Sequence, residues 1–268
     1  METSQSVRVL HPEYKLVGMD GTSRVYSSNP SVSQIPKIIR YAVIPYSHKK
    51  FLYADLKAAE VYILVKWAKC QTLIDAYESG QDLYLVITRA ILKKEEVTKE
   101  ERDTIKAVVL SILYGSEGLS ASKLLHIEES VAKGFVDAFF SAYPEIKRFQ
   151  ETVWDYVSEH SYTQTFYFRP RIFNLEADEL GVKRQAVNTA IQGTCADCLK
   201  MCIGEISSDK CRFITSVFDS ILLEVDKDMT REQAKELLSD IFSHCQPFNF
   251  KFEFGMGNSW GEAQADMQ

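Results

Sequence analysis

The hydrophobic and polar positions of the sequence repeat with different periods along the chain, and each period predicts an element. Phe51-Leu-Tyr-Ala-Asp55 is an apolar run that predicts a buried strand ending in a carboxylate. The next segment, LKAAEVYILVKWAKC, carries apolar residues at helical spacing. From Gln71 to Arg148 the pattern predicts mainly helix, with Asp82 as a candidate N-cap.

The segment from Arg102 to Gly115 has the most informative spacing. Its residues at steps of four share one helix face, and they are Arg102, Lys106, Leu110 and Tyr114. The remaining positions are largely apolar, and Gly115 ends the helix. This face suits a surface helix with solvated charges. It also suits a helix whose cations hold a polyphosphate while a base lies over Leu110 and Tyr114.

Beyond residue 144 the pattern predicts helix, hairpin and helix in turn. Residues 145–160 are amphipathic at helical spacing. The stretch TQTFYFRPRIFNL alternates around the basic tip Arg169-Pro170-Arg171 and predicts a hairpin. Residues 183–203 return to a helical pattern, which predicts one continuous helix.

Two apolar runs near the C-terminus, 212–218 and 221–225, predict strands joined by Asp219-Ser220 in a tight two-residue turn. A helix (TREQAKELLSDIF) and a last strand (FNFKFEFGMG) follow. The order of elements predicts an α+β fold, in which an antiparallel sheet is interrupted by a mostly α-helical subdomain.

The 268 residues carry a net charge of −6, which argues against indiscriminate coating of nucleic acid. Positive charge is concentrated in residues 1–50, so a local basic cleft remains compatible with this balance. The sequence has no run of eighteen apolar residues, and METSQSVRVLHPEY lacks the apolar core of a signal peptide. We therefore expect a protein that has no membrane partner and acts in the cytoplasm.

Three cysteines, Cys195, Cys198 and Cys202, have the spacing C-x2-C-x3-C. With Cys211 as a fourth ligand they could hold zinc or an iron–sulfur cluster. On a helix, however, this spacing spreads the sulfurs over two turns, which suits small core residues better than a metal site. We expect buried cysteines.

Asp55 and Asp219 are each predicted at the end of a strand. If these strands are neighbours, both carboxylates can face a pair of Mg²⁺ ions, because carboxylate oxygens are ligands that Mg²⁺ prefers. Together with the cations Arg102 and Lys106, such a pair supplies what nucleotidyl transfer needs.

These motifs resemble the polymerase region of family A DNA polymerases, the group of bacterial DNA polymerase I and its phage relatives. The family's first motif matches Asp55-Leu-Lys-Ala-Ala-Glu60, and its second, Arg-x3-Lys-x7-Tyr-Gly, matches Arg102 to Gly115. The third, usually His-Asp-Glu, appears as Phe218-Asp219-Ser220. Further segments also match, so that the resemblance extends from about His11 to the C-terminus: SRVYSSNPSVSQIP, RQAVNTAIQGTCAD and FGMGNSWGEA.

The resemblance implies roles for individual residues. Asp55, Asp219 and the Leu56 carbonyl would bind two Mg²⁺ ions. Glu60 would be the steric gate that excludes a 2′-hydroxyl. The implied nucleotide-binding residues are Arg102, Lys106, Leu110, Tyr114, Glu60 and Tyr84. The implied DNA-binding residues are Arg24, Arg184, Asn188, Gln192 and Phe218.

Several positions depart from the family pattern. Phe218 replaces a His that touches the primer terminus, and Ser220 replaces a Glu. Leu110 replaces the Phe or Tyr against which the sugar of the nucleotide packs, and Tyr84 stands where a phosphate-contacting His is usual. The two acids and the two phosphate-binding cations are retained, so the resemblance implies activity with an altered supporting environment.

The resemblance also implies an organisation: palm in residues 1–57, fingers in 58–184, and palm again in 185–268. The thumb and exonuclease domains of the family are expected to be absent. We therefore expect one piece of a split DNA polymerase, from a viral or mobile-element source, whose second subunit supplies the missing parts.

The function implied is template-directed addition of dNTPs to a primer 3′-OH by a two-metal mechanism, with primer–template DNA and dNTP as partners. Three alternatives remain open. A single-subunit RNA polymerase shares several of these signals, although Glu60 and the QGTCAD segment favour DNA. A non-catalytic DNA-binding or scaffold subunit could keep the same fold, and a metal-cluster module on the cysteines is the third.

Overall fold

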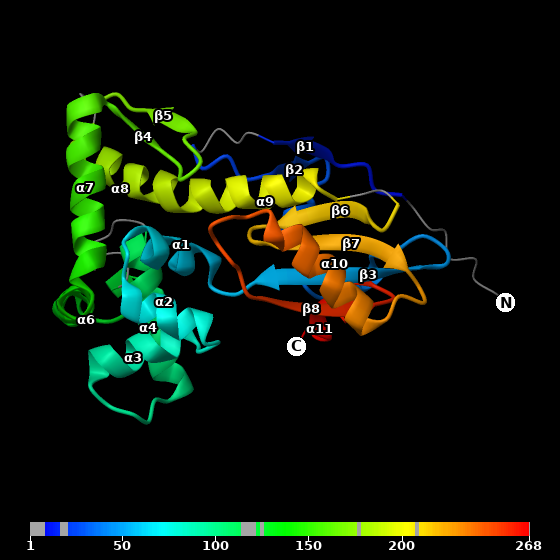
Figure 1. Cartoon of the computed structure of the whole chain (residues 1–268), viewed down its shortest axis with the longest axis horizontal. Helices are drawn as coiled ribbons and strands as arrows, with labels where there is room; N and C mark the ends of the chain where they lie inside the picture. The colour runs from blue at the N-terminus through cyan, green and yellow to red at the C-terminus, as the bar shows by residue number, and fades with distance from the viewer. Residues whose placement is uncertain are drawn as a thin grey trace. The chain divides into compact units, whose positions relative to one another are not determined.

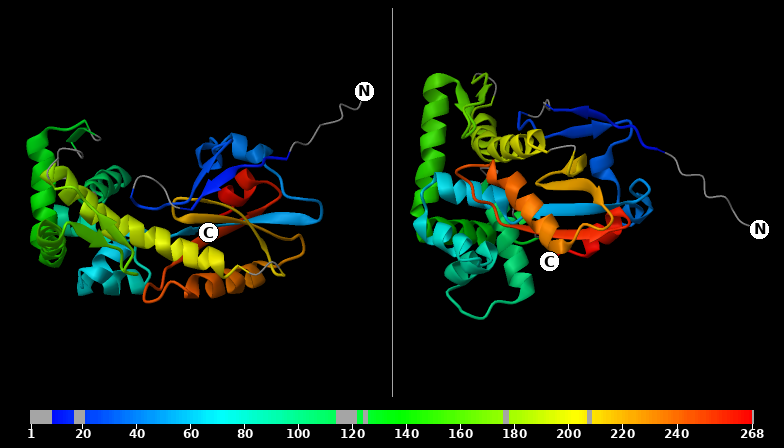
Figure 2. Two further views of the ribbon diagram at one scale, coloured as in Figure 1. Left: turned by 90° about the horizontal axis from the view of Figure 1, so that it is seen from above. Right: turned by 45° about the vertical axis from the view of Figure 1, so that its right-hand side comes forward.

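The computed structural model describes residues 9–16, 21–113, 122–123, 126–175, 178–206 and 209–267. The chain forms two compact units (Figures 1 and 2). Unit 1 comprises Met1–Asp55, Cys202–Phe242 and Phe252–Gln268, and unit 2 comprises Leu56–Met201 and Ser243–Lys251. The palm and fingers boundaries expected at 57/58 and 184/185 remain a prediction.

A four-stranded sheet forms the centre of unit 1, with strand order β6-β7-β3-β8 (Figure 1). Strand β7 pairs antiparallel with both β3 and β6. The bounds of its strands are β3 Lys49–Leu56, β6 Arg212–Val217, β7 Ser220–Asp226 and β8 Phe252–Gly257. The strand expected at Phe51–Asp55 is therefore confirmed, and it is longer at both ends.

The β6–β7 turn differs by one residue from the expectation. Strand β6 ends at Val217 and β7 begins at Ser220, so Phe218 and Asp219 form the turn instead of Asp219 and Ser220. Ser220 is only 1% exposed and pairs with Asp55 in the β3–β7 ladder, which places it in the sheet. Phe218 takes the left-handed conformation, with φ 58°, that the tight turn needs.

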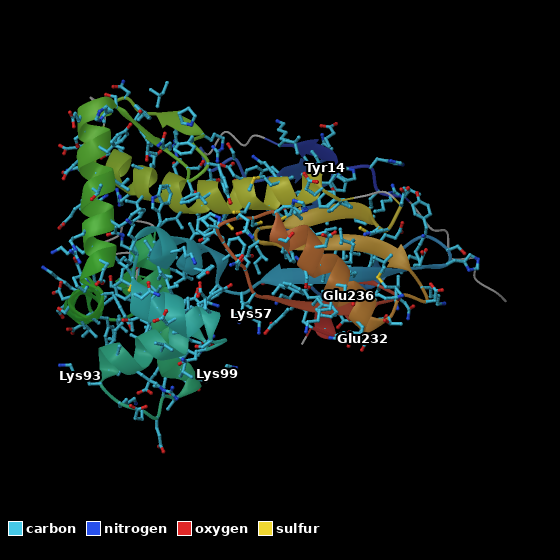
Figure 3. The ribbon with its side chains drawn as sticks, viewed as in Figure 1. Tyr14, Lys57, Lys93, Lys99, Glu232 and Glu236 are labelled. Atoms are coloured by element: carbon cyan, nitrogen blue, oxygen red, sulfur yellow. The ribbon has the colours of Figure 1, made fainter. Side chains whose placement is uncertain are left out.

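Unit 1 also contains helices and strands outside this sheet. Their bounds are β1 Glu13–Lys15, β2 Tyr26–Ser28, η1 Val32–Gln34, η2 Ile39–Ala42, α10 Arg231–Ser243 and α11 Trp260–Ala265. Tyr14 on β1 (Figure 3) donates a hydrogen bond of 2.9 Å to the Ile214 carbonyl on β6. The buried core includes Phe51, Tyr53 and Trp260. Helix α11 approaches η2 so closely that a Cβ on Gly261 would lie 2.4 Å from the Tyr41 ring.

Unit 2 is mainly helical. Its helices are α1 Ala59–Trp67, α2 Gln71–Glu78, α3 Leu83–Leu92, α4 Lys99–Leu113, α6 Glu129–Ala142, α7 Pro144–His160, α8 Glu179–Asn188 and α9 Thr194–Gly204, the last continuing into unit 1. The predicted antiparallel hairpin is present as β4 Tyr162–Gln164 and β5 Pro170–Ile172. Its expected tip was wrong: Pro170 and Arg171 pair with Gln164 and Thr163 in the strands, and the loop is formed by residues 165–169. This combination of sheet and helices confirms the α+β fold class.

The helix predicted for 183–203 is confirmed, and the helical backbone runs from Glu179 to Gly204 with one irregularity. Between α8 and α9 the backbone forms one π-helical segment, η3 Thr189–Gly193. Gly193 is required by close packing, since a Cβ there would lie 2.8 Å from the Thr165 methyl carbon and 3.0 Å from Arg169. Segments of π-helix are rare and occur frequently at functional sites.

The six cysteines are all buried and unbridged. Among the described residues, no group of three or more His, Cys, Asp or Glu side chains is arranged to hold a metal ion. Cys195, Cys198 and Cys202 are at most 5% exposed, which confirms that they are core residues. No helix within the described ranges is long and apolar enough to cross a membrane.

Candidate functional site

Asp55 and Asp219 lie next to each other at one end of the sheet in unit 1. Asp55 is the cross-strand partner of Ser220, and Asp219 directly precedes Ser220. Residues opposite each other in an antiparallel pair have Cβ atoms about 5 Å apart, so Asp55 lies directly across from the residue that follows Asp219. Both side chains are half-buried, so they remain accessible from solvent.

Ser220 is held in place beneath this pair by Tyr53. The Tyr53 hydroxyl donates to Ser220 Oγ at 2.9 Å, and Ser220 Oγ donates in turn to the Val217 carbonyl at 2.8 Å. Burial raises the pKa of Tyr53, and the negative charges of Asp55 and Asp219 add to that shift, so the phenol stays protonated and remains a donor. Tyr53 was not among the expected site residues, although its position two residues before Asp55 puts it on the same strand face.

The oxygen atoms at this end of the sheet suit a hard cation. Asp55 and Asp219 offer carboxylate oxygens, and the Leu56 carbonyl follows Asp55 directly. Mg²⁺ is bound in proteins by one or two carboxylates together with waters and substrate phosphates, so two acids are a sufficient set. The residues present therefore fit the ions that the sequence implies.

Phe218 and Arg24 lie together at the tip of the β6–β7 turn. The Phe218 ring is 66% exposed, and the guanidinium carbon of Arg24 is 5.3 Å from its centroid. This is a cation–π distance. Two of the expected DNA-binding residues, from segments almost 200 positions apart, are thus brought into contact one residue away from Asp219.

In unit 2, helix α4 carries the predicted cationic face. Arg102, Lys106 and Leu110 are half-buried, whereas the other side of the helix is buried, as in Val108, Val109 and Ile112. The shared face is confirmed for these three positions. Tyr114 and Gly115 lie outside the described residues.

Helix α4 begins at Lys99 (Figure 3), before Arg102, the first residue of the cationic face. Thr98 Oγ1 accepts a hydrogen bond from the Glu101 amide at 3.2 Å, and Glu101 Oε2 accepts one from the Thr98 amide at 2.9 Å. These reciprocal bonds form a capping box, for which the Thr-x-x-Glu spacing is a recognisable signal. The charged residues directly before Arg102, from Lys99 on, are therefore part of the helix.

Asp82 binds Arg102. Its Oδ2 accepts from Arg102 Nε at 2.9 Å and from Nη2 at 2.6 Å. Its Oδ1 accepts from the Tyr84 and Leu85 amides at 2.9 and 3.2 Å, which confirms the predicted N-cap of α3. Spacing alone does not show that this cap also pairs with a cation twenty residues later.

The ring of Tyr84 lies beside both cations of α4. The Arg102 guanidinium carbon is 5.5 Å from the ring centroid and Lys106 Nζ is 5.1 Å from it. Tyr84 is only 8% exposed. Its aromatic face can therefore support two positive charges that would otherwise repel each other.

Glu60 and Gln192 meet within unit 2. Glu60 is in the first turn of α1, and Gln192 Nε2 donates to Glu60 Oε2 at 3.4 Å from η3. Arg184, Asn188 and Gln192 follow one another at steps of four, and they range from exposed Arg184 to buried Gln192. Asn188 Oδ1 is buried and has no hydrogen-bond partner among the described residues.

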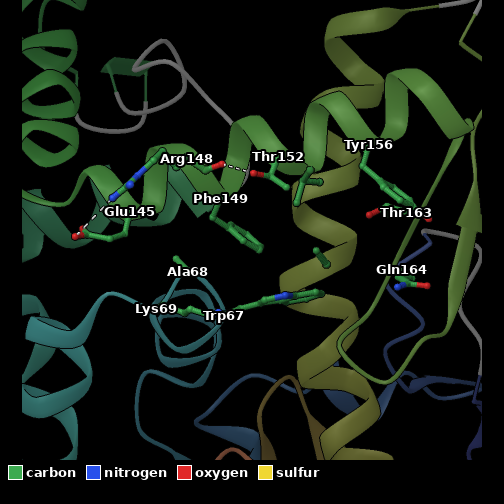
Figure 4. Close-up of a pocket in the computed structure, with 12 residues that line it drawn as sticks. Trp67, Ala68, Lys69, Glu145, Arg148, Phe149, Thr152, Tyr156, Thr163 and Gln164 are labelled. Carbon is green, nitrogen blue, oxygen red and sulfur yellow. Dashed lines mark hydrogen bonds and ion pairs between the residues drawn. The ribbon is translucent and has the colours of Figure 1, made fainter.

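Unit 2 also contains a cavity of about 650 Å³ that the sequence did not indicate (Figure 4). Aromatic side chains line part of it, and the Trp67 and Phe149 ring centroids are 5.4 Å apart. Arg148, which is 70% exposed, lies at its edge and approaches Glu145 at 3.9 Å.

Comparisons with known proteins agree with these features. The profile described as DNA polymerase family A matches residues 2–262. DNA polymerase I of Chloroflexus aurantiacus is 28% identical over 94% of this chain, and that of Pseudomonas aeruginosa is 27% identical over 90%. The chain spans 29% of the length of each of these relatives.

Among solved structures, the POL domain of Pol1 from M. smegmatis, in complex with DNA primer-template and dNTP, has the same fold. The TM-score is 0.86 at 24% sequence identity, and the match covers 95% of this chain and 48% of that one.

Proposed function

Because the chain belongs to DNA polymerase family A, we propose that it is the palm and fingers part of a template-directed DNA polymerase. The observation that carries this proposal is the pairing of Asp55 with Ser220, which sets Asp55 beside Asp219. The relatives named DNA polymerase I and the neighbour bound to primer-template and dNTP support it. A scaffold subunit would need neither acid.

In this proposal Asp55, Asp219 and the Leu56 carbonyl hold two Mg²⁺ ions. When bound, these ions activate the attacking hydroxyl and stabilise the charge on the leaving group. The carboxylates fix the position of that chemistry on a rigid sheet. Tyr53 and Ser220 keep the β3–β7 end ordered, so that the two acids keep their spacing.

The nucleotide is proposed to bind to the exposed face of α4. Arg102 and Lys106 neutralise and orient its triphosphate, with Tyr84 beneath both cations. Leu110 offers its sugar an aliphatic contact in place of an aromatic one, and Tyr114, four positions later in the sequence, is proposed as a further nucleotide contact. Glu60 excludes a 2′-hydroxyl, and Gln192 holds the Glu60 carboxylate in place.

DNA contacts are proposed for residues from both units, each on its own element. Arg24 and Phe218 would touch the primer terminus beside Asp219. Arg184, which is exposed, would reach the backbone, while Asn188 and Gln192 would contact the minor groove near the new base pair. The unpartnered Oδ1 of Asn188 supports such a role, since a buried acceptor without a partner is costly.

The reaction that follows is nucleotidyl transfer. The primer 3′-oxygen forms a bond to the α-phosphorus of the dNTP, the bond to the β-phosphate oxygen breaks, and pyrophosphate leaves with the electron pair. The hydroxyl proton passes to solvent. Arg102 and Lys106 stabilise the charge that accumulates on the leaving pyrophosphate.

A second polypeptide that binds to unit 1 is part of the proposal. In unit 1 a row of large apolar side chains is exposed between residues 38 and 46: Ile38, Ile39, Tyr41, Ile44 and Tyr46. Contiguous exposed apolar residues of this kind mark interaction surfaces. The expected observation is that extension becomes stronger when the chain is combined with a polypeptide that binds to these side chains.

Primer extension tests the function directly. The wild-type chain, alone or with a polypeptide that binds to unit 1, should extend a primer with dNTPs and much less with NTPs, and Asp219→Ala should not. Equal extension by Asp219→Ala would refute the catalytic assignment. DNA binding without extension by the wild type would favour a scaffold subunit.

A further inference from the structure

Asp82 divides its two carboxylate oxygens between two tasks. Oδ1 caps α3 through the Tyr84 and Leu85 amides. Oδ2 accepts two hydrogen bonds from Arg102, at 2.9 Å from Nε and 2.6 Å from Nη2. The cap and the ion pair thus depend on different atoms of one side chain, and either can break while the other stays.

The ion pair occupies the donors that a phosphate would use. Nε and Nη2 form one edge of the guanidinium fork, which suits bidentate binding of a carboxylate or a phosphate. A third nitrogen, Nη1, is 3.3 Å from Asp103 Oδ1. In this structure, the Nε and Nη2 donors of Arg102 are therefore both occupied by the Asp82 carboxylate.

We propose that Asp82 competes with the triphosphate of the nucleotide for Arg102, so that nucleotide binding proceeds by exchange of one anion for another. This inference rests on the proposed function, because it takes the α4 face as the triphosphate site. Asp82 is then a specificity-determining residue: a weakly charged phosphate cannot displace it, whereas a triphosphate bound by Lys106 as well can.

The surroundings permit the exchange. The side chains of Arg102 and Asp82 are 30% and 40% exposed, and partly exposed ion pairs contribute little to stability. When Arg102 leaves Oδ2, the bonds to Oδ1 still cap α3. The Tyr84 ring lies within 5.5 Å of the Arg102 guanidinium carbon and remains available as a cation–π partner.

The decisive variants keep the cap and remove the charge. Asp82→Asn and Asp82→Ser both retain an oxygen that can cap α3. Asp75→Asn is the matched control, because it removes one exposed carboxylate on α2 that accepts a hydrogen bond from the Gln71 side chain rather than from a cation. Each change is made in the wild-type and in the Arg102→Ala background.

The readouts are the KM and kcat for dNTP in primer extension, and dNTP affinity measured on a complex with a dideoxy-terminated primer. Asp82→Asn and Asp82→Ser should lower KM and the dissociation constant by about two- to fivefold, the range that a partly exposed ion pair supplies. Asp75→Asn should change neither. In the Arg102→Ala background the Asp82 variants should no longer lower KM or the dissociation constant, because there is no Arg102 guanidinium for Asp82 to occupy.

Two results would overturn the exchange: an unchanged or raised KM in both Asp82 variants, or a gain that persists without Arg102. Either one, with normal extension by the wild type, leaves the proposed function intact. Absence of extension by the wild type, alone and with its partner, would refute both.

Discussion

Asp55 faces Ser220 across the β3–β7 ladder, and Ser220 follows Asp219 in the chain. The register of one strand pair therefore determines how far apart the two acids are. A shift by one residue would turn Asp55 to the other face of the sheet, because side chains alternate along a strand. The hydrogen bond from Tyr53 to Ser220 lies at this position and supports the register.

Replacing Asp55 by Asn should reduce primer extension by at least about 100-fold, since a neutral amide is a much weaker ligand for a divalent cation. Asp226→Asn is the control: Asp226 lies at the opposite end of β7, is exposed, and pairs with Lys49. It should leave the rate unchanged. A comparable loss in both variants would point to a general charge effect instead of a site.

Tyr53→Phe should lower the free energy of unfolding by about 1 kcal/mol, because it removes a buried hydrogen bond to Ser220. Tyr14→Phe removes a hydroxyl from the same unit at an exposed position, and its cost should be smaller. Urea denaturation of the two variants measures the difference. A greater loss in Tyr14→Phe would contradict the supporting role of Tyr53.

Glu60→Ala should lower the preference for dNTP over NTP by about 10- to 100-fold, since loss of the side chain makes room for a 2′-hydroxyl. Glu60→Gln keeps nearly the same size and can still bond Gln192, so it should retain most of the preference. The ratio of kcat/KM for the two substrates gives the answer. An equal loss of preference in Glu60→Ala and Glu60→Gln would mean that the charge of Glu60, and not its volume, discriminates between the two sugars.

Stability should fall at alkaline pH because tyrosines are buried. Burial raises the pKa of Tyr143 from 10.0 to about 12, so the unfolded chain releases this proton first. The stabilisation is fully present below pH 10 and is lost as the pH rises toward 12, by about 1.4 kcal/mol per pH unit for each such group. Urea titrations between pH 10 and 12 measure how the free energy of unfolding depends on pH. Tyr143→Phe should reduce this dependence by the contribution of one buried tyrosine. An unchanged slope would show that Tyr143 does not contribute.

The cysteines should be unreactive in the native protein. All six are buried, and hydrogen bonding to Cys245 together with burial raises the pKa of Cys198. The reactive species is the thiolate, so a colorimetric thiol reagent should label no cysteine before unfolding and six in denaturant. Rapid labelling of Cys198 at neutral pH would contradict the buried position.

The local sequence pattern was sufficient to predict an element whose formation depends only on residues close together in the chain. The buried strand ending at Asp55, the cap at Asp82 and the shared face of Arg102, Lys106 and Leu110 all follow from spacing. It was insufficient at the β6–β7 turn, where pairing with β3 draws Ser220 into the sheet. Within 183–203 it predicted helix correctly but did not indicate the π-helical segment, where Gly193 packs against Thr165.

The sequence by itself determined which residues could do chemistry: two acids, two cations and a carboxylate gate, each in a recognisable spacing. Only the tertiary structure decided what each of them touches. Asp82 accepts hydrogen bonds from the Arg102 guanidinium, Gln192 donates one to Glu60, and the Arg24 guanidinium lies over the Phe218 ring. The reason is physical: spacing follows from the period of one helix or strand, whereas a contact between residues 20 to 194 positions apart depends on how whole elements pack.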